Sequence, residues 1–330
     1  MTILTKDSVQ LKEYLDSIHF LQSDEAITAV SVPGDGNMNF TLRVNTNQRS
    51  FIIKQSRSYV EKYPQVAAPA KRAMQEHKFY TTIANDAHLA LRIPAILSAD
   101  AEHNVLIMQD LGEGTPYVSY YQTHEQISIG DLDILVDFLI HLHGNHKLSD
   151  AHDRLSNIAM RQLNHEHMYV YPLSHDNGLN LDDISPGLQD YATELRSNKL
   201  LVNNMTELGK IYLSDGDTLL HGDYFLGSWL RIVDDIYVID PEFGHHGTKE
   251  FELGVMLAHL MMAQQPEHYI DHCIHRYTQS ISIHIDLVMA FAGGEIIRRL
   301  CGLAQLPLSA TLHQRQVLLD RAQDMVLNLS

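Results

Sequence analysis

Three acidic side chains in one short stretch carry most of the chemistry that this sequence can do. The stretch, 219–243, reads LLHGDYFLGSWLRIVDDIYVIDPEF and contains Asp223, Asp240 and Glu242. Gly222 permits a tight turn just before Asp223. Carboxylates gathered at one place repel each other unless they share a cation, and Mg²⁺ takes such oxygen ligands together with substrate phosphates. The pattern therefore indicates phosphoryl transfer, with Asp223 orienting an acceptor hydroxyl as catalytic base and Asp240 with Glu242 holding Mg²⁺.

A β-hairpin is expected to bring these carboxylates together. Apolar residues at 232–233 precede the polar pair Asp234-Asp235, and an apolar run at 236–239 follows it. This pattern predicts two strands with Asp-Asp at the turn. Because a hairpin brings its ends together, Asp223 should face the segment 240–242. Taken singly, each fragment is equally well explained as a plain turn or a solvated loop, and only their combination favours a site.

These segments resemble a known family. HGDYFLGSWL followed by VIDPEF is similar to the catalytic and metal segments of the protein-kinase-like small-molecule phosphotransferases, which include aminoglycoside phosphotransferases, choline kinase and methylthioribose kinase. The resemblance implies that Asp223 is the catalytic base and that Asp240 binds Mg²⁺. Most of these enzymes have Asn where this chain has Ser228, whereas methylthioribose kinases are similar to it in having Ser there. Ser228 is therefore placed among the nucleotide-binding residues.

A glycine-containing turn near the N-terminus extends the resemblance. GDGNMNFTLRV looks like the GDGNxN loop of methylthioribose kinases, which implies that Gly34, Asp35, Gly36 and Asn37 lie over the ATP phosphates. Glycines in such a loop let backbone N–H groups approach a phosphate closely. Without the resemblance, the same residues are best explained as an ordinary hairpin turn between two strands.

Lys54 ends the apolar strand predicted at 50–55. A kinase uses a lysine at this position to contact the α/β-phosphates, whereas the plain alternative is an edge-strand lysine in solvent. The resemblance implies that Lys54 pairs with a Glu on the following helix, which is predicted over 69–83. Glu76 is the first choice for this partner, and Glu61 is the second.

The segment LIMQDLG resembles the hinge between the lobes of kinase-like enzymes. It follows two predicted strands, 91–99 and 105–108, that would complete a small antiparallel sheet. The resemblance implies that backbone groups of Gln109 and Leu111 bind adenine. Residues 1–112 are then expected to form an N-terminal lobe that binds ATP, and residues 113–330 a C-terminal lobe for catalysis and substrate binding.

Two further regions of the expected C-terminal lobe bear on the substrate. Periodicity is weak over 152–190, which predicts an insertion above the substrate side. Arg298 and Arg299 are adjacent in an otherwise apolar helical stretch, so at least one needs a buried partner. RRLCGLAQ resembles the C-terminal RRxxGLA segment of methylthioribose kinases, which implies that both arginines lie at the substrate pocket. The alternative for each is a structural ion pair with an acidic residue of the same lobe.

Composition limits the classes of partner. The 330 residues are 45% hydrophobic and 20% charged, which is ordinary for a globular protein. A formal net charge of −17 opposes binding to nucleic acid or to an anionic membrane. Only Cys273 and Cys301 are present, and no signal-peptide core or long apolar segment is found. We expect a cytoplasmic protein whose partner is a small molecule, and we leave a homodimer open.

The sequence as a whole predicts a two-lobed, protein-kinase-like α+β fold, with a small antiparallel-sheet N-lobe and a larger, mainly helical C-lobe. The expected reaction is ATP- and Mg²⁺-dependent phosphorylation of a hydroxyl on a small metabolite, first methylthioribose or a related sugar. One alternative is a kinase for another small alcohol of the aminoglycoside, choline or homoserine type. The other is a non-catalytic, nucleotide-binding regulatory module, which only Ser228 favours. GTP in place of ATP is left open.

Overall fold

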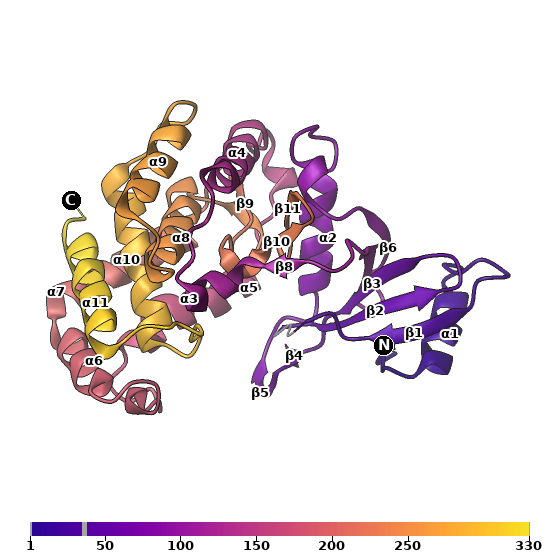
Figure 1. Ribbon diagram of the computed structural model, residues 1–330, viewed down its shortest axis with the longest axis horizontal. Coiled ribbons are helices and arrows are strands. Elements are labelled where there is room, and N and C mark those ends of the chain that lie inside the picture. Colours follow the sequence, from indigo (N-terminus) through magenta and orange to yellow (C-terminus); the bar gives the residue numbers. More distant parts are fainter. Residues whose placement is uncertain (1, 35–37, 330) are drawn as a thin grey trace.

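A five-stranded antiparallel sheet forms the N-terminal part of the chain. The computed structural model describes residues 2–34 and 38–329, and Figure 1 shows the sheet at one end of an elongated molecule with most helices at the other. The strand order is β1-β2-β3-β7-β6. The five strands are β1 (Ile27–Ser31), β2 (Phe40–Thr46), β3 (Ser50–Gln55), β6 (Ile96–Asp100) and β7 (Val105–Gln109).

Helices cover both faces of this sheet. Val105 and Ile107 of β7 share a buried cluster with α1 (Ser8–Ser17), whereas Leu106 and Met108 share one with α2 (Arg72–Ile83). Successive side chains of a strand point to opposite faces. Strand β7 is therefore buried on both faces, which explains why its sequence is an uninterrupted apolar run.

Three smaller groups of short strands lie outside the five-stranded sheet. The hairpin β4 (Tyr59–Val60) and β5 (Tyr63–Ala67) lies between β3 and α2 in sequence. Beyond β7, β8 (Thr115–Pro116) pairs with β10 (Trp229–Ile232), which pairs in turn with β11 (Asp235–Val238). A separate antiparallel pair joins β9 (Thr218–Leu220) to β12 (His245–Gly247).

The predicted hairpin is present, but its turn lies one residue earlier than expected. Ile232 pairs with Asp235, so Asp235 opens the second strand. Val233 and Asp234 form the turn, and Val233 adopts a positive φ of 55°. The prediction of an Asp-Asp turn was wrong, because the turn places a β-branched residue in a left-handed conformation that such residues rarely adopt.

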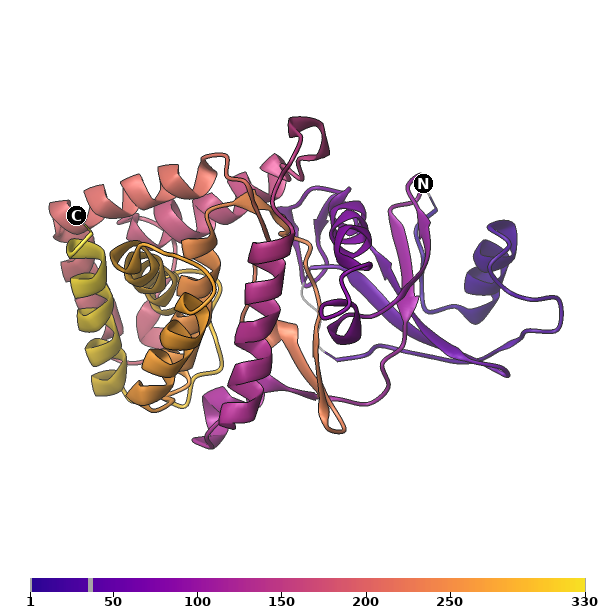
Figure 2. The same cartoon turned by 90° about the horizontal axis from the view of Figure 1, so that it is seen from above.

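Nine α-helices follow one another in the described part of the C-terminal region. They are α3 (Tyr120–Thr123), α4 (Ile129–Asn145), α5 (Ile158–His165), α6 (Leu188–Ser197), α7 (Lys199–Leu213), α8 (Lys249–Met262), α9 (Glu267–Thr278), α10 (Ile285–Cys301) and α11 (Leu312–Leu327). Figure 2 shows this helical part beside the sheet from a second direction. Of the residues that the structure describes, no helix is both long and apolar enough to cross a membrane.

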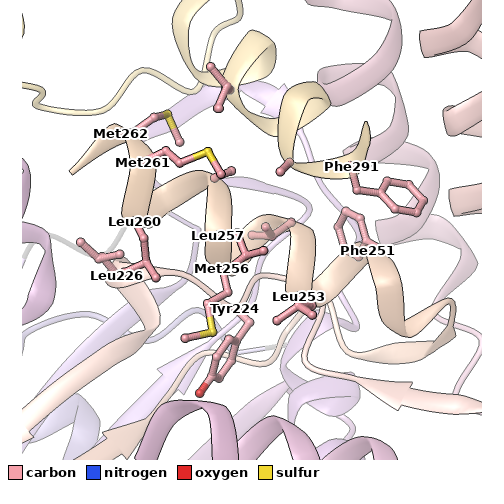
Figure 3. Packing of buried hydrophobic residues seen from close by; sticks show 14 of the residues in the cluster. Tyr224, Leu226, Phe251, Leu253, Met256, Leu257, Leu260, Met261, Met262 and Phe291 are labelled. Atoms are coloured by element: carbon pink, nitrogen blue, oxygen red, sulfur yellow. The ribbon is translucent and has the colours of Figure 1, made fainter. Parts of the chain in front are cut away.

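The centre of the helical part is α8. All of its residues from Glu250 to Met262 are buried, and it packs closely against α10. Figure 3 shows Phe251 of α8 beside Phe291 of α10, with Tyr224 below α8 and Leu226 beside Leu260. Because Tyr224 and Leu226 directly follow the His-Gly-Asp turn, the core holds the expected catalytic segment in place.

One further prediction for secondary structure was wrong. The strand expected at 91–99 starts only at Ile96, after a 3₁₀ turn η1 (Ala90–Arg92). The weakly periodic region 152–190 contains α5, a π-helical turn η4 (Glu166–Val170), the 3₁₀ turns η5 (Tyr171–Leu173) and η6 (Leu181–Asp183), and the start of α6. Helix α5 was not predicted, because two of the residues on its buried face, Arg161 and Asn164, are polar.

Candidate active site

The His-Gly-Asp turn lies directly against the Asp-Pro-Glu segment. Leu220 pairs with His245, so the chain enters the turn beside the exit from 240–244. Gly222 has a φ of 84°, and a Cβ at this position would lie 2.2 Å from the backbone oxygen of Phe243. Only glycine fits so close an approach.

The His221 imidazole links the turn to the residue after β11 through two hydrogen bonds. Its Nδ1 accepts a hydrogen bond from the backbone N–H of Asp223 at 3.3 Å, and its Nε2 donates one to the backbone oxygen of Ile239 at 2.9 Å. Burial lowers the pKa of His221, which favours this neutral tautomer. Asp223 and Asp240 are thereby held near each other through one imidazole.

Glu252 of α8 stabilises the same turn by accepting two backbone hydrogen bonds. Its carboxylate accepts from the backbone N–H groups of His221 at 3.0 Å and Gly222 at 2.7 Å. His143 of α4 donates to it at 2.9 Å and in turn accepts from the hydroxyl of Tyr277. Sequence reasoning missed this support, because residues from three helices meet here without any common motif.

Lys54 lies between two carboxylates that come from distant parts of the chain. Its Nζ is 2.8 Å from Oε1 of Glu76 on α2, and it also contacts Asp240. Burial would lower the pKa of Lys54, but Asp240 and Glu76 raise it well above its usual value, so the side chain stays cationic. Glu61, the second choice for this partner, pairs instead with Arg57 at 2.9 Å.

Asp240 and Glu242 differ in their surroundings although they are two residues apart. The Asp240 side chain is 46% exposed, and its backbone has a φ of 64°. Glu242 is buried, where its Oε2 accepts from Nδ2 of Asn39 at 2.9 Å and lies 3.5 Å from Nε of Arg72. Burial raises the pKa of Glu242 to about 8, against the opposing charge of Arg72. Asn39 and Arg72 had not been singled out from the sequence.

Asp223 faces the arginine pair on α10. Nη2 of Arg299 lies 3.6 Å from Oδ1 of Asp223, whose side chain is 25% exposed. Burial raises the pKa of Asp223, while Arg299 and Arg298 oppose the rise. The buried Ser228 hydroxyl donates to the backbone oxygen of Asp223 at 2.7 Å and so holds the turn from its other side.

Both arginines share a buried carboxylate that the sequence analysis did not name. Glu295 accepts from Nε of Arg299 at 2.6 Å and from Nη1 of Arg298 at 3.0 Å. Burial opposes its ionisation, but Arg298 and Arg299 hold the pKa of Glu295 well below its usual range. Its position three and four residues before the arginines is the helical spacing that could have revealed it. Arg298 and Arg299 therefore form a structural ion pair with Glu295 and, through Arg299, also lie at the candidate site.

His259 of α8 completes the arginine cluster. Its Nε2 donates to Oε1 of Glu295 at 2.9 Å, and its Nδ1 accepts from the hydroxyl of Tyr121. Burial lowers the pKa of His259 to about 4, so the ring is neutral near pH 7. The cluster of Tyr121, His259, Glu295, Arg298 and Arg299 therefore presents its positive charge towards Asp223.

The expected hinge runs between the two parts of the molecule. The N–H of Gln109 donates to the backbone oxygen of Ala95 at 2.8 Å, and Leu111 is half-buried. Arg43 of β2 holds the following residues, with its Nε 3.0 Å from Asp110 and an Nη2 donating to the oxygen of Gly112 at 2.7 Å. The adenine-binding role of Gln109 and Leu111 stays a prediction.

The glycine loop is described only in part. Gly34 has a φ of 77°, a backbone conformation that favours glycine. Asp35, Gly36 and Asn37 lie outside the described residues. Their predicted contact with ATP phosphates therefore stays a prediction.

The residues near Lys54 suit a magnesium site with few protein ligands better than a metal site formed wholly by protein side chains. Within residues 2–34 and 38–329, no three His, Cys, Asp or Glu side chains gather as a metal-binding group. Among the described residues, Oε2 of Glu76 has no hydrogen-bond partner, and the Asp240 carboxylate is partly exposed. Such oxygen donors fit Mg²⁺, which usually takes one or two carboxylates and completes its shell with water and phosphates.

Comparisons with known proteins agree with this geometry. The model of the phosphotransferase enzyme family, APH, matches residues 30–282. Methylthioribose kinase from Bacillus velezensis is 25% identical over 354 residues, covering 91% of this chain and 86% of the relative. Methylthioribose kinase from Bacillus cereus (strain AH820) is 26% identical over 245 residues, covering 69% of this chain and 59% of the relative. The chain thus matches less than two thirds of the length of the latter.

Solved structures share the fold at low sequence identity. Spectinomycin phosphotransferase in complex with ADP and spectinomycin has a TM-score of 0.55 at 12% identity, with 98% of each chain covered. Choline kinase LicA from Streptococcus pneumoniae has a TM-score of 0.54 at 11% identity, covering 96% of this chain and 98% of the other. The predicted protein-kinase-like α+β fold is confirmed. With a family model that matches most of its length, the chain belongs to the phosphotransferase enzyme family.

Proposed function

We propose that this chain transfers the γ-phosphoryl group of ATP to a hydroxyl of methylthioribose or a related sugar. The observation that carries the proposal is the joining of two half-sites by His221. One half contains Asp223 opposite Arg299, and the other contains Lys54 opposite Asp240. A base for the acceptor and a cation for the phosphates are the parts that phosphoryl transfer requires.

Asp223 would orient the acceptor hydroxyl and take its proton. Its raised pKa brings it closer to the working pH and so makes it a better base than an ordinary aspartate. Arg298 and Arg299 would bind the acceptor beside Asp223 and orient it. Ser228 would keep the turn in shape through its bond to the Asp223 carbonyl.

The other half-site would bind the nucleotide. Lys54, held by Glu76, would contact the phosphates, with Gly34 to Asn37 above them and the backbone of Gln109 and Leu111 at the adenine. Asp240 and Glu242 would hold Mg²⁺, which supplies positive charge to neutralise the phosphates when bound. Use of ATP is supported by the ADP bound to the structurally similar spectinomycin phosphotransferase.

The proposed acceptor follows from the relatives and from charge. The curated relatives named above are methylthioribose kinases. Arg299 already pairs with Asp223, which disfavours a cationic acceptor such as an aminoglycoside or choline, whereas a neutral sugar offers hydroxyls that arginine can bind. We place this activity in the cytoplasm, as the composition suggests.

A substrate panel tests the proposal. ATP consumption with Mg²⁺ is measured for 5-methylthioribose, ribose analogues, amino-alcohols and aminoglycosides, with the Asp223→Asn protein as the blank. We expect turnover of methylthioribose or a close analogue that disappears in the variant. Efficient turnover of a cationic compound would overturn the role of the arginines. ADP binding without turnover of any compound would favour the non-catalytic module instead.

A further inference from the structure

Two side-chain contacts join β2 and β3 to the Asp-Pro-Glu segment. Lys54 of β3 contacts Asp240, and Asn39, just before β2, donates to Glu242 at 2.9 Å. Thr41 pairs with Lys54 across the two strands, so Asn39 lies two residues from the strand partner of Lys54. The acceptors are also two residues apart, so the contacts run side by side.

The two contacts differ in their access to solvent. Lys54 bonds to a carboxylate whose side chain is 46% exposed. Asn39 and Glu242 are only 8% and 7% exposed. A ligand that enters the site can therefore reach the Lys54 contact, whereas the Asn39 contact is shielded. When Lys54 binds a phosphate, the Lys54–Asp240 contact weakens and the Asn39–Glu242 contact does not.

Arg72 reinforces the shielded contact. It is fully buried at the start of α2, and its Nε lies 3.5 Å from the same oxygen of Glu242 that Asn39 binds. Its Nη2 donates to the backbone oxygens of Met38 and, at 3.1 Å, Tyr59. One guanidinium thus ties the entry to β2 and the β4–β5 hairpin to Glu242.

We propose that Asn39 and Arg72 are positioning residues for nucleotide binding. Through Glu242 they hold the entry to β2 against the segment 240–242, so the two lobes keep their alignment while Lys54 exchanges Asp240 for a phosphate. Breaking a hydrogen bond between buried groups leaves a polar group without a partner away from water, which is costly. The inference rests on the proposed function, because it assumes that the nucleotide binds beside Lys54.

The test compares two asparagine variants at opposite ends of β2. Asn39→Ala removes the shielded bond. Asn47→Ala is the matched control, because Asn47 lies just beyond β2 and its Nδ2 donates to the backbone oxygen of Asp24. Amide hydrogen exchange is followed over 38–43 in the protein without nucleotide, and the Kd for ADP with Mg²⁺ is measured by calorimetry, together with the KM of the acceptor.

For Asn39→Ala we expect faster exchange over 38–43 and a Kd for ADP about tenfold higher, with the acceptor KM unchanged. Asn39→Asp should weaken ADP further, because a second carboxylate would face Glu242. Asn47→Ala should leave the Kd for ADP at the wild-type value.

Unchanged exchange in Asn39→Ala, or faster exchange with an unchanged Kd, would overturn the inference and leave the contact structural at most. A rise in Kd that Asn47→Ala reproduces would do the same. If the wild-type protein binds no ADP, the proposed function itself fails. If the wild type binds ADP and Asn39→Ala binds it equally well, only the inference fails.

Discussion

The proposed acceptor side and the proposed nucleotide side of the candidate site are assembled in different ways. On the acceptor side, Glu295, Arg298 and Arg299 lie on one turn of α10, three and four residues apart. On the nucleotide side, Lys54 bonds to partners 22 and 186 residues away, Glu76 and Asp240. The two arginines and their shared carboxylate thus come from one helix, although Asp223 and His259 reach them from other segments. The Lys54 cluster, by contrast, exists only where separate segments meet.

This difference predicts unequal responses to change. The arginine cluster is buried in the helical core and should keep its geometry whether or not a nucleotide is bound. The Lys54 cluster ends in the partly exposed Asp240 and depends on how the lobes meet. Variants in the arginine cluster should therefore change mainly the acceptor KM, and variants in the Lys54 cluster mainly the nucleotide KM.

Asp223→Asn should have the largest effect, because Asp223 is the proposed catalytic base. We expect kcat to fall by about 10³-fold, since an amide cannot accept the proton. Binding of ADP should be nearly unchanged, because Lys54 and its partners remain. Steady-state kinetics and calorimetry check both, with Asp234→Asn at the exposed hairpin turn as the control. Wild-type kcat in Asp223→Asn would remove Asp223 from the mechanism.

Lys54→Met should have the next largest effect. This effect should appear in the kinetic constants for ATP. We expect kcat/KM for ATP to fall about 10²-fold, because one positive charge towards the phosphates is lost. The acceptor KM should change little. Lys62→Met removes an exposed lysine of the same lobe and serves as the control. An equal rise in the acceptor KM would contradict the separation of the two sides.

Glu295→Gln should affect the acceptor side more than the nucleotide side. Loss of the carboxylate leaves Arg298 and Arg299 without their shared partner, so we expect the acceptor KM to rise about tenfold. The KM for ATP should stay within about twofold, because no residue of the Lys54 cluster touches Glu295. Glu76→Gln is the mirror variant and should raise the KM for ATP instead. If both variants raise both constants equally, the comparison fails.

The pH profile gives the smallest but most specific test. Since burial raises the pKa of Asp223, kcat/KM should fall about tenfold per pH unit as pH drops below that value, and this acid limb should lie above the ordinary range of an aspartate. Glu295 contributes to the rise, so Glu295→Gln should move the limb to lower pH. Glu76→Gln should leave the limb in place. An acid limb near pH 4 in the wild type would contradict the role of burial.

Sequence patterns predicted the parts of the site that are local. The His-Gly-Asp turn, the hairpin and the arginine pair are each read from a few consecutive residues, and Glu76 lies on a helix that follows Lys54 closely. Helix α5 and the supports of the turn were not predicted, because Arg161, Glu252 and His143 are buried polar residues without periodic signal. The lobe boundary after residue 112 stays a prediction.

Motifs in the sequence indicated the family and the fold class through their resemblance to known phosphotransferases, and they named acidic, basic and glycine candidates for the site. Which of these side chains meet is visible only in the folded chain. The tertiary structure paired Glu242 with Asn39 and Arg72, and Asp223 with Arg299. Such pairings depend on burial and on segments up to about 200 residues apart, and a buried charge is stable only where a partner from another element reaches it.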